Sequence, residues 1–322
     1  MKVKGSIIQN KFLRVQTLNY GASLFEIYHK KKKINLILNL GSKKNYCFKH
    51  ASVGSTCGRY AGRIANSKFK IANKNFILNA NEGKHILHGG KIGFAALPWK
   101  KINHSKDKII YQLHSRDRDQ GFPGHLVVNC TYKIKGKFLI IKYEYKSNKS
   151  THVNLTNHSY WNLEKNKNNM IYNHELKLNS NKYLLVNKSL IPTGKFKNVK
   201  NSIYNFLKFE NIGNKLNYFK SKNLDIKFKG FDTTFVIKKN SRNLVASLKS
   251  KMSNIQVDFF SNLPGIQLYS AQNLNYKKKL FPYQGICLET QYFPNSPNKK
   301  NFPSTLIRPN KSYSSITKIR IN

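Results

Sequence analysis

Short runs in which apolar and polar residues alternate recur along almost the whole chain. Six of them occupy residues 108–114, 125–132, 137–145, 255–260, 266–269 and 285–291. They are rich in β-branched and aromatic residues, and Gly124 and Gly136 mark turns between the first three. A period of two puts one side of each segment against a core, so the pattern predicts an all-β protein, built as a sandwich or a barrel.

Helical periodicity is scarce, and residues 202–208 form the one stretch that predicts a short helix. No internal repeat, flexible linker or low-complexity tract divides the 322 residues, apart from a general Lys and Asn bias. Because single all-β domains routinely exceed about 200 residues, we predict one domain over residues 1–322. Hydrophobic residues make up 39% of the chain, which excludes a disordered protein.

The charge balance is extreme, with 58 Lys and Arg against 13 Asp and Glu and a formal net charge of +45. One interpretation is a polyanionic partner, either nucleic acid or an anionic membrane surface. The other is compositional drift, since Lys, Asn and Ile are all abundant and the lysines are scattered. We favour drift, and we expect no specific nucleic-acid partner.

The four cysteines are Cys47, Cys57, Cys130 and Cys287, and none forms a C-x-x-C pair. This spacing argues against a zinc ribbon or a redox motif, and it predicts buried free thiols in a reducing compartment. Residues 1–8 are basic but lack an apolar stretch of signal-peptide length. No segment approaches the length of a membrane span, so we expect a cytoplasmic protein that makes no membrane contact.

Acidic residues are rare in this chain, so their positions are informative. Glu289 lies in 285–291, a segment that otherwise predicts a largely buried strand. Alternation places Cys287, Glu289 and Gln291 on one face of that strand. A buried carboxylate is costly unless it is paired or hydrogen-bonded. The pattern therefore predicts either a functional Glu289 or an exposed glutamate on an edge strand.

His158 lies in the polar and aromatic segment 153–163. A period of two places Asn154, Thr156, His158 and Tyr160 on one face. Such a face suits a sugar, which needs hydrogen-bond partners for its hydroxyls and a ring to stack on. The alternative is a histidine with a purely structural role.

Three further residues are candidates for a binding site. His88 precedes a glycine pair, which permits close approach of a ligand, or it is a surface histidine in an ordinary turn. Arg63 lies in 58–65 among glycines and a second arginine, without the spacing of a phosphate-binding loop. Asp232 begins another predicted strand or is a plain turn residue.

Seven segments taken together are more specific than any one of them. In order, they are Gly58-Arg-Tyr-Ala-Gly-Arg-Ile-Ala-Asn, Leu87-His-Gly-Gly, Gly121-Phe-Pro-Gly, Asn157-His-Ser-Tyr-Trp-Asn-Leu, Gly230-Phe-Asp, Pro264-Gly-Ile-Gln-Leu-Tyr and Leu288-Glu-Thr-Gln. In this order and spacing the chain resembles the aldose 1-epimerase (galactose mutarotase) family over roughly residues 10–320. The early Asn19-Tyr-Gly-Ala-Ser and the late Phe293-Pro-Asn-Ser-Pro-Asn fit the same resemblance.

The resemblance implies a large, twisted antiparallel β-sandwich, the galactose mutarotase-like supersandwich, with an open sugar cleft and no cofactor. It implies that Glu289 is the general base and His158 the general acid of an anomer exchange. The residues that it implies for sugar binding are Arg63, His88, Tyr160, Asp232 and Gln267. Gly62 departs from the family, whose members often carry Asn there, so the preferred aldose stays open.

Two other functions remain open at this point. An epimerase of the same fold could act on a hexose 6-phosphate, although the segments 87–90 and 157–161 resemble the branch that acts on free sugars. A carbohydrate-binding or polyanion-binding protein could have lost catalysis, although Glu289 and His158 are both present. We expect a small sugar as the substrate, a monomer or a homodimer, and no metal, because no Cys/His cluster has ligand spacing.

Overall fold

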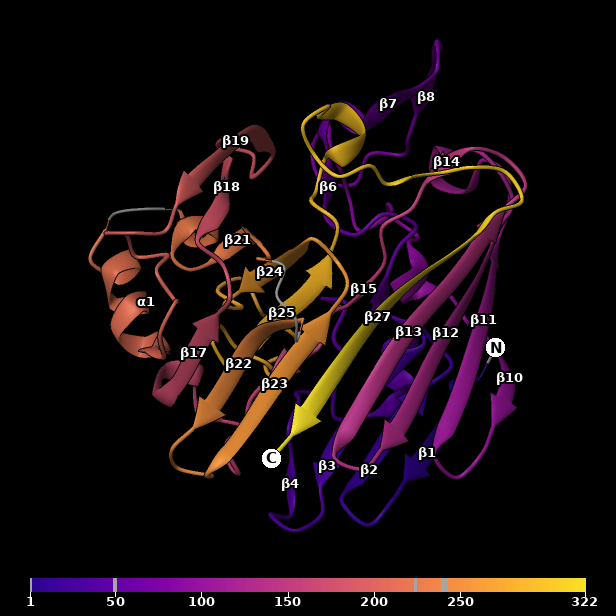
Figure 1. The fold of residues 1–322 in the computed structure, drawn as a ribbon. Helices are drawn as coiled ribbons and strands as arrows, with labels where there is room; N and C mark the ends of the chain where they lie inside the picture. The colour runs from indigo at the N-terminus through magenta and orange to yellow at the C-terminus, as the bar shows by residue number, and fades with distance from the viewer. Residues whose placement is uncertain (1, 49–50, 223–224, 239–242) are drawn as a thin grey trace.

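A nine-stranded antiparallel sheet is the largest layer of the computed structural model, which describes residues 2–48, 51–222, 225–238 and 243–322. Its strands, in spatial order, are β10 (Lys100–His104), β11 (Lys108–Ser115), β12 (Leu126–Lys135), β13 (Phe138–Ser147), β27 (Ser312–Ile321), β23 (Ile255–Ser261), β22 (Leu244–Ser250), β17 (His174–Leu178) and β20 (Glu210–Asn211). Figure 1 shows that β27, the last strand of the chain, lies in the middle of this sheet. It pairs with β13 on one side and β23 on the other, and so joins the two halves.

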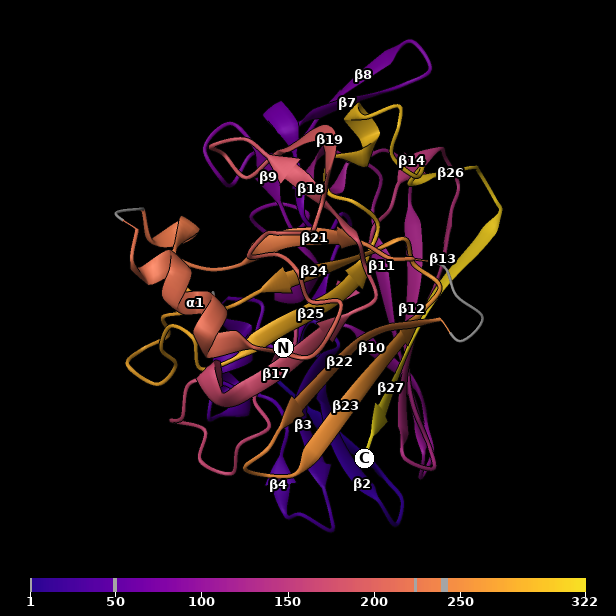
Figure 2. The same ribbon diagram turned by 60° about the vertical axis from the view of Figure 1, so that its left-hand side comes forward.

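Two smaller sheets contribute to the core that lies against the large sheet. A six-stranded sheet has the order β16 (Tyr160–Trp161), β25 (Ile286–Gln291), β24 (Gly265–Tyr269), β21 (Asp232–Val236), β18 (Lys182–Val186) and β19 (Pro192–Asn198). A four-stranded sheet consists of β1 (Gly5–Gln9), β2 (Leu13–Leu18), β3 (Ser23–His29) and β4 (Ile34–Asn35). In Figure 2 the strands β21, β24 and β25 lie one above another, across the view.

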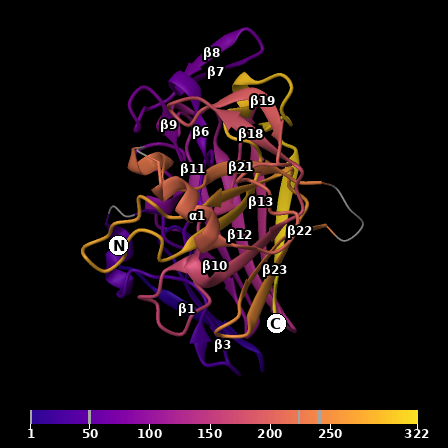
Figure 3. The same ribbon diagram turned by 90° about the vertical axis from the view of Figure 1, so that its left-hand side faces the viewer.

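Four two-stranded pairings complete the strand inventory of the described residues. They join β5 (Thr56–Cys57) to β15 (Thr156–Asn157), β6 (Arg63–Ile64) to β9 (Ile86–Leu87), β7 (Lys68–Ile71) to β8 (Lys74–Ile77), and β14 (Thr151–His152) to β26 (Leu306–Ile307). Figures 1–3 all place the β7–β8 and β18–β19 hairpins at one end of the molecule, and Figures 1 and 3 place β6 at the same end. Short 3-10 turns lie at Lys43–Cys47, Ala65–Ser67, Phe94–Ala96, Asp119–Gly121, Ile171–Asn173, Ile226–Phe228 and Ser296–Asn298.

The all-β sandwich predicted from the sequence is confirmed. All six alternating runs are strands, with bounds within a few residues of those predicted. Burial alternates along β12 and β13, so every second side chain enters the core and its neighbour faces outward. One apolar core takes residues from all three larger sheets. In contrast, β25 is buried along its whole length and on both faces.

The helix predicted at 202–208 is wrong, because these residues form turns. The hydroxyl of Ser202 donates to the carbonyl of Val199, and the amide of Leu207 donates to the side chain of Asn205. Side chains of Ser and Asn that bond to nearby backbone groups in this way compete with helical hydrogen bonds. The local pattern of polarity could not reveal that competition.

The one α-helix of the described residues, α1 (Ile212–Lys220), begins a few residues later. The side-chain oxygen of Asn211 accepts a hydrogen bond from the amide of Asn214, which caps the helix. The residues Ile212, Leu216 and Phe219 are buried, so the helix packs on one apolar stripe.

Cys57, Cys130 and Cys287 are buried free thiols, as predicted, whereas Cys47 is exposed. The prediction was wrong for Cys47 because it lies at the end of a surface 3-10 turn and not in a strand. No helix in the described parts of the chain is long and apolar enough to cross a membrane.

Candidate functional site

The register of the six-stranded sheet aligns a first row of polar and aromatic side chains. Asp232 on β21 pairs with Tyr269 on β24, which pairs with Cys287 on β25. Cys287 in turn pairs with Tyr160 on β16. Directly paired residues of neighbouring strands share a face of the sheet, so these four side chains lie on one face.

A second row lies two residues away on the same face. Thr234 pairs with Gln267, and Gln267 pairs with Glu289. Continuing the pairing of β16 with β25 by two residues brings His158 opposite Glu289. The two rows therefore gather residues that are up to 131 positions apart in the sequence, from His158 to Glu289.

Glu289 is buried, with only 2% of its surface exposed. Its Oε1 lies 3.7 Å from Nε2 of His158, and its Oε2 has no hydrogen-bond partner among the described residues. Burial, and then the negative charge of Asp232, raise the pKa of Glu289 well above its ordinary value. The alternative of an exposed glutamate on an edge strand is excluded. A carboxyl with a raised pKa and a free oxygen can accept a proton near neutral pH.

His158 is held by its backbone and by three rings. Its amide donates to the carbonyl of Ser55, which anchors the main chain. Its ring centroid lies 5.0 Å from that of Tyr160, 5.4 Å from that of His88 and 6.3 Å from that of Tyr269. The other ring nitrogen, Nδ1, lies 3.5 Å from the sulfur of Cys287.

The predicted polar and aromatic face of segment 153–163 is only partly present, because the segment is broken into short strands. Asn154 donates to the carbonyls of Ala61 and Tyr292, and Thr156 donates to a carbonyl of β25. These two buried side chains are occupied by structural bonds. Tyr160 is also buried and donates to the carbonyl of Ala51, so its ring supports His158 from the side.

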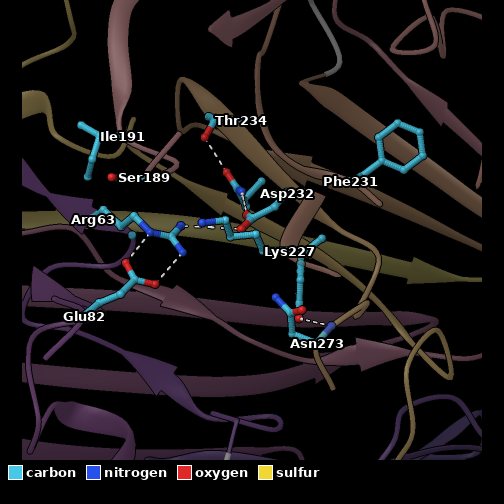
Figure 4. A network of polar contacts seen from close by, with 12 residues as sticks. Arg63, Glu82, Ser189, Ile191, Lys227, Phe231, Asp232, Thr234 and Asn273 are labelled. Carbon is cyan, nitrogen blue, oxygen red and sulfur yellow. Dashed lines mark hydrogen bonds and ion pairs between the residues drawn. The ribbon is translucent and has the colours of Figure 1, made fainter. Parts of the chain in front are cut away.

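A network of ionic and polar contacts surrounds Arg63 (Figure 4). Its guanidinium donates two hydrogen bonds to Glu82, at 2.6 and 2.8 Å, and Nη1 lies 3.6 Å from Oδ2 of Asp232. Gln267 donates to Asp232 and accepts from Thr234. Burial lowers the pKa of Arg63, but the charge of Asp232 and the bonds to Glu82 outweigh it and raise that pKa. Arg63 thus stays protonated, and the carboxylates of Glu82 and Asp232 balance its positive charge.

His88 comes from the loop after β9, and the pairing of β9 with β6 brings it near Arg63. Its backbone is left-handed, with φ of +50°, and Gly89 and Gly90 after it also have positive φ. A Cβ on Gly89 would lie 2.0 Å from the carbonyl oxygen of Gly58, so only glycine fits. Burial, and then the charges of His158 and Arg63, lower the pKa of His88 well below its ordinary value. His88 does lie in a turn and is only half-buried, but it contacts the ring of His158 instead of facing open solvent.

Gly62, the position that departs from the family pattern, has a structural role here. Its amide donates to Nδ1 of His88 at 3.3 Å, so the neutral ring of His88 carries its proton on Nε2. The φ of Gly62 is +75°, and a Cβ would lie 2.8 Å from the ring of Pro294. A side chain at this position would therefore require local rearrangement.

The two arginines of segment 58–65 have different roles. Arg59 is 2% exposed and donates to backbone carbonyls, among them those of Ser115, Pro123 and Gly124. It is a structural residue. Asp232 is the first residue of β21, so the alternative of a plain turn aspartate is wrong.

One group among the described residues has donor atoms that a metal ion could take. His158, Cys287 and Glu289 each offer one, and these atoms all lie within 4.8 Å of one another. Imidazole, thiolate and carboxylate are all zinc ligands. The expectation of no metal rested on ligand spacing along the chain, which does not reveal this group: Cys287 and Glu289 share β25, and folding brings His158 to them from the segment before β16. A small internal cavity lies on the other face of β25, lined in part by Leu288 and Thr290.

All seven predicted site residues lie in or beside the two rows, and four further side chains join them. Cys287 had been placed on the face of Glu289, and Tyr269 could have been found by the same alternation from Gln267. Thr234 follows in the same way from Asp232. Glu82 gave no local signal, because it lies in an irregular loop.

Comparison with known proteins gives one consistent result. The model of the aldose 1-epimerase family matches residues 6–320. A galactose mutarotase from Sus scrofa is 32% identical over 320 residues, which cover 96% of this chain and 91% of the relative. An aldose 1-epimerase from Escherichia coli (strain K12) is 31% identical over 291 residues, covering 87% and 83%.

Solved structures are similar over the same length. An aldose epimerase homologue from C. elegans has a TM-score of 0.92 and 25% identity, with 100% of this chain and 99% of that chain covered. A galactose 1-epimerase from Lactobacillus acidophilus has a TM-score of 0.88 and 25% identity, with coverage of 100% and 95%. The similarity therefore includes every strand that carries the two rows.

Proposed function

The chain belongs to the aldose 1-epimerase family, and on that premise we propose that it interconverts the α and β anomers of free hexoses, with Glu289 as general base and His158 as general acid. It is accordingly an isomerase. The observation that carries the assignment of roles is the buried pair itself. Oε1 of the Glu289 carboxyl lies 3.7 Å from Nε2 of the His158 imidazole, on one face of the sheet, and Oε2 of the same carboxyl has no hydrogen-bond partner among the described residues.

Ring opening needs one proton removed and one delivered. The Glu289 carboxylate takes the proton of the C1 hydroxyl, the His158 imidazolium gives its Nε2 proton to the ring oxygen, and the bond between C1 and that oxygen breaks. The product is an open-chain aldehyde, which rotates about the C1–C2 bond. In closure, Nε2 takes the proton back from the C5 hydroxyl, the oxygen attacks C1, and Glu289 returns its proton to the carbonyl oxygen.

Four of the remaining predicted residues would hold the sugar, while Tyr160 supports the ring of His158. Arg63, Asp232 and Gln267 provide a mixture of donors and acceptors, as neutral hydroxyls require. His88 would donate through Nε2, because the amide of Gly62 occupies its Nδ1. Arg63 and Asp232 are partly exposed, with 14% and 16% of their side chains accessible, whereas the acid and base are deeply buried. This gradient suits a sugar that enters with its reacting end first.

The ion pairs of Arg63 favour a free hexose over a hexose 6-phosphate. Arg63 is the one predicted site residue suited to bidentate phosphate binding, but Glu82 already occupies it with two hydrogen bonds. A phosphate would have to displace that carboxylate, and Asp232 would repel it. We propose that both glucose and galactose are accepted.

The catalytic roles are tested by polarimetry on freshly dissolved α-D-glucose and α-D-galactose. We expect Glu289→Gln and His158→Asn each to lower kcat by roughly 10²-fold or more, the usual contribution of a general acid or base. Matched controls are Glu144→Gln on the outer face of β13 and His125→Asn near β12, which should leave kcat unchanged. A folded Glu289 or His158 variant with near-wild-type mutarotation would remove that residue from the mechanism.

Substrate choice is tested by comparing kcat/KM for glucose and glucose 6-phosphate. The comparison belongs at about 0.15 M salt or above, because the net charge attracts any anion at low salt. We expect a clear preference for glucose. In Glu82→Gln the guanidinium of Arg63 loses its ion pair, so we expect the ratio of the two kcat/KM values to become smaller. A preference of the wild-type protein for the phosphorylated sugar would establish the alternative function instead.

Several coarser features complete the proposal. We propose that catalysis needs no metal, so dialysis against a strong chelator should leave the rate unchanged, and restoration of a lost rate by one metal would contradict this.

We propose one domain over residues 1–322, supported by a core that draws on residues from Ile8 to Ile321. A cytoplasmic location is supported by the buried free thiols.

A further inference from the structure

We propose that Cys287 is a positioning residue, whose sulfur holds His158 in the tautomer and orientation in which Nε2 exchanges protons with the sugar. This inference rests on the proposed role of His158 as the acid of the reaction. It assigns a function to a buried side chain that the mechanism above does not use.

The two nitrogens of His158 face two residues of the same strand. Cys287 precedes Glu289 by two positions on β25, so both side chains project from one face. The sulfur of Cys287 lies 3.5 Å from Nδ1, and Oε1 of Glu289 lies 3.7 Å from Nε2. Each nitrogen of the ring therefore contacts a different side chain of the same strand.

The reaction needs one particular tautomer of the neutral ring. After ring opening His158 has given up its Nε2 proton, and closure requires the Nε2 lone pair to take a proton back. The neutral imidazole must therefore keep its proton on Nδ1. A cysteine sulfur is a weak acceptor, so an Nδ1–H to sulfur hydrogen bond would stabilise this tautomer against the one that carries its proton on Nε2.

Packing and hydrogen bonding have separate effects on this imidazole. The rings of Tyr160, His88 and Tyr269 fix the plane of the imidazole, but these ring contacts do not by themselves determine which nitrogen is protonated. The contact with Cys287 distinguishes the two nitrogens. A substitution of Cys287 would thus change the proton position without removing the acid.

The sulfur acts as a neutral thiol. Burial, and then the charge of Glu289, raise the pKa of Cys287 well above its ordinary value. An imidazolium beside a thiol can give up its proton, whereas one paired with a thiolate would hold it more tightly. The titratable and charged groups around the two residues come from several elements: Cys57 on β5, Arg63 on β6, His88 after β9, Tyr160 on β16, Asp232 on β21, Tyr269 on β24 and Glu289 on β25.

The test combines kinetics with a direct view of the proton. In Cys287→Ala we expect kcat to fall by about 3- to 10-fold, as for one lost hydrogen bond, with KM within about twofold. The ¹⁵N NMR shifts of His158 should move toward the Nε2–H tautomer, and the pH profile of kcat should change shape. Cys287→Ser should restore most of kcat, because a hydroxyl oxygen also accepts a hydrogen bond. Cys130→Ala, which removes a buried thiol from the core, is the matched control.

Each result bears on the inference in a distinct way. A folded Cys287→Ala protein with unchanged kcat and unchanged ¹⁵N shifts would overturn it, as would an equal loss of kcat in Cys130→Ala, which would indicate general damage to the core. If the alanine variant fails to fold, the serine variant and the NMR spectrum of the wild-type protein still decide the tautomer. If the wild-type protein has no mutarotase activity, the proposed function fails, while the ¹⁵N shifts still test the contact.

Discussion

At the scale of single residues, the site brings together groups whose pKa values are shifted by burial so that the neutral form is favoured. Glu289 is buried beside a second carboxylate, and this environment raises its pKa. The ionised form, which the proposed role of Glu289 as general base needs, is therefore disfavoured by folding. The contribution of this residue to stability is complete below its unfolded pKa near 4.5, and it is lost as the pH rises toward the folded pKa.

This linkage predicts that Glu289→Gln stabilises the protein at alkaline pH while abolishing most activity. Near pH 4 the glutamate of the wild-type protein and the glutamine of the variant are both neutral, so the two proteins should have the same melting temperature. As the pH rises above the unfolded pKa, the variant should become increasingly more stable than the wild-type protein, because glutamine never ionises. Calorimetry of both proteins across this range measures the difference. A constant difference, or a variant that is less stable at pH 9, would contradict the raised pKa.

At the scale of elements, β25 and α1 show how context decides burial. β25 is buried on both faces because one face packs in the core, and His158, His88 and Arg63 of β6 lie over the other. The alternation of side chains along this strand therefore does not predict which of them are exposed. By contrast, α1 is short and exposed on one side, so its end cap carries a larger share of its stability.

The capping bond of α1 predicts a local effect on stability. Asn211→Ala should lower the free energy of unfolding by about 1 kcal/mol, because the amide of Asn214 loses its acceptor. The kcat should not change. Asn214→Ala is the control, since only the backbone of that residue takes part in the bond. Urea denaturation measures both variants, and equal losses would show that the cap is unimportant.

At the scale of the whole molecule, the net charge of +45 dominates the long-range electrostatics. A charge of this size attracts polyanions without recognising them. We expect binding to random-sequence DNA that fades steeply between about 50 and 200 mM salt, as counterion release requires. Filter binding or fluorescence anisotropy over this range checks the prediction. A sequence-selective complex that survives physiological salt would mean that the charge has a dedicated partner.

Part of the fold and of the candidate site can be predicted from local sequence alone. The period-two pattern predicted the six strands, because alternation of side chains is a property of the extended backbone itself. The order of the family-like segments predicted which residues gather at the site. It could do so because Glu289, His158 and Asp232 each lie in a recognisable segment. The helix at 202–208 was mistaken, since side-chain bonds from Ser202 and Asn205 outweighed a weak helical pattern.

The rest was decided by the tertiary structure. Strand pairing joins segments across long stretches of chain, as when β27 enters between β13 and β23, and no local pattern specifies such a partner. The bonds from Glu82 to Arg63 and the contact of Cys287 with His158 arise in the same way. Proton positions and pKa shifts depend on distances of a few ångströms and on burial. These exist only after distant strands have packed, so the sequence could name Glu289 and His158 as the candidate base and acid but not their environment.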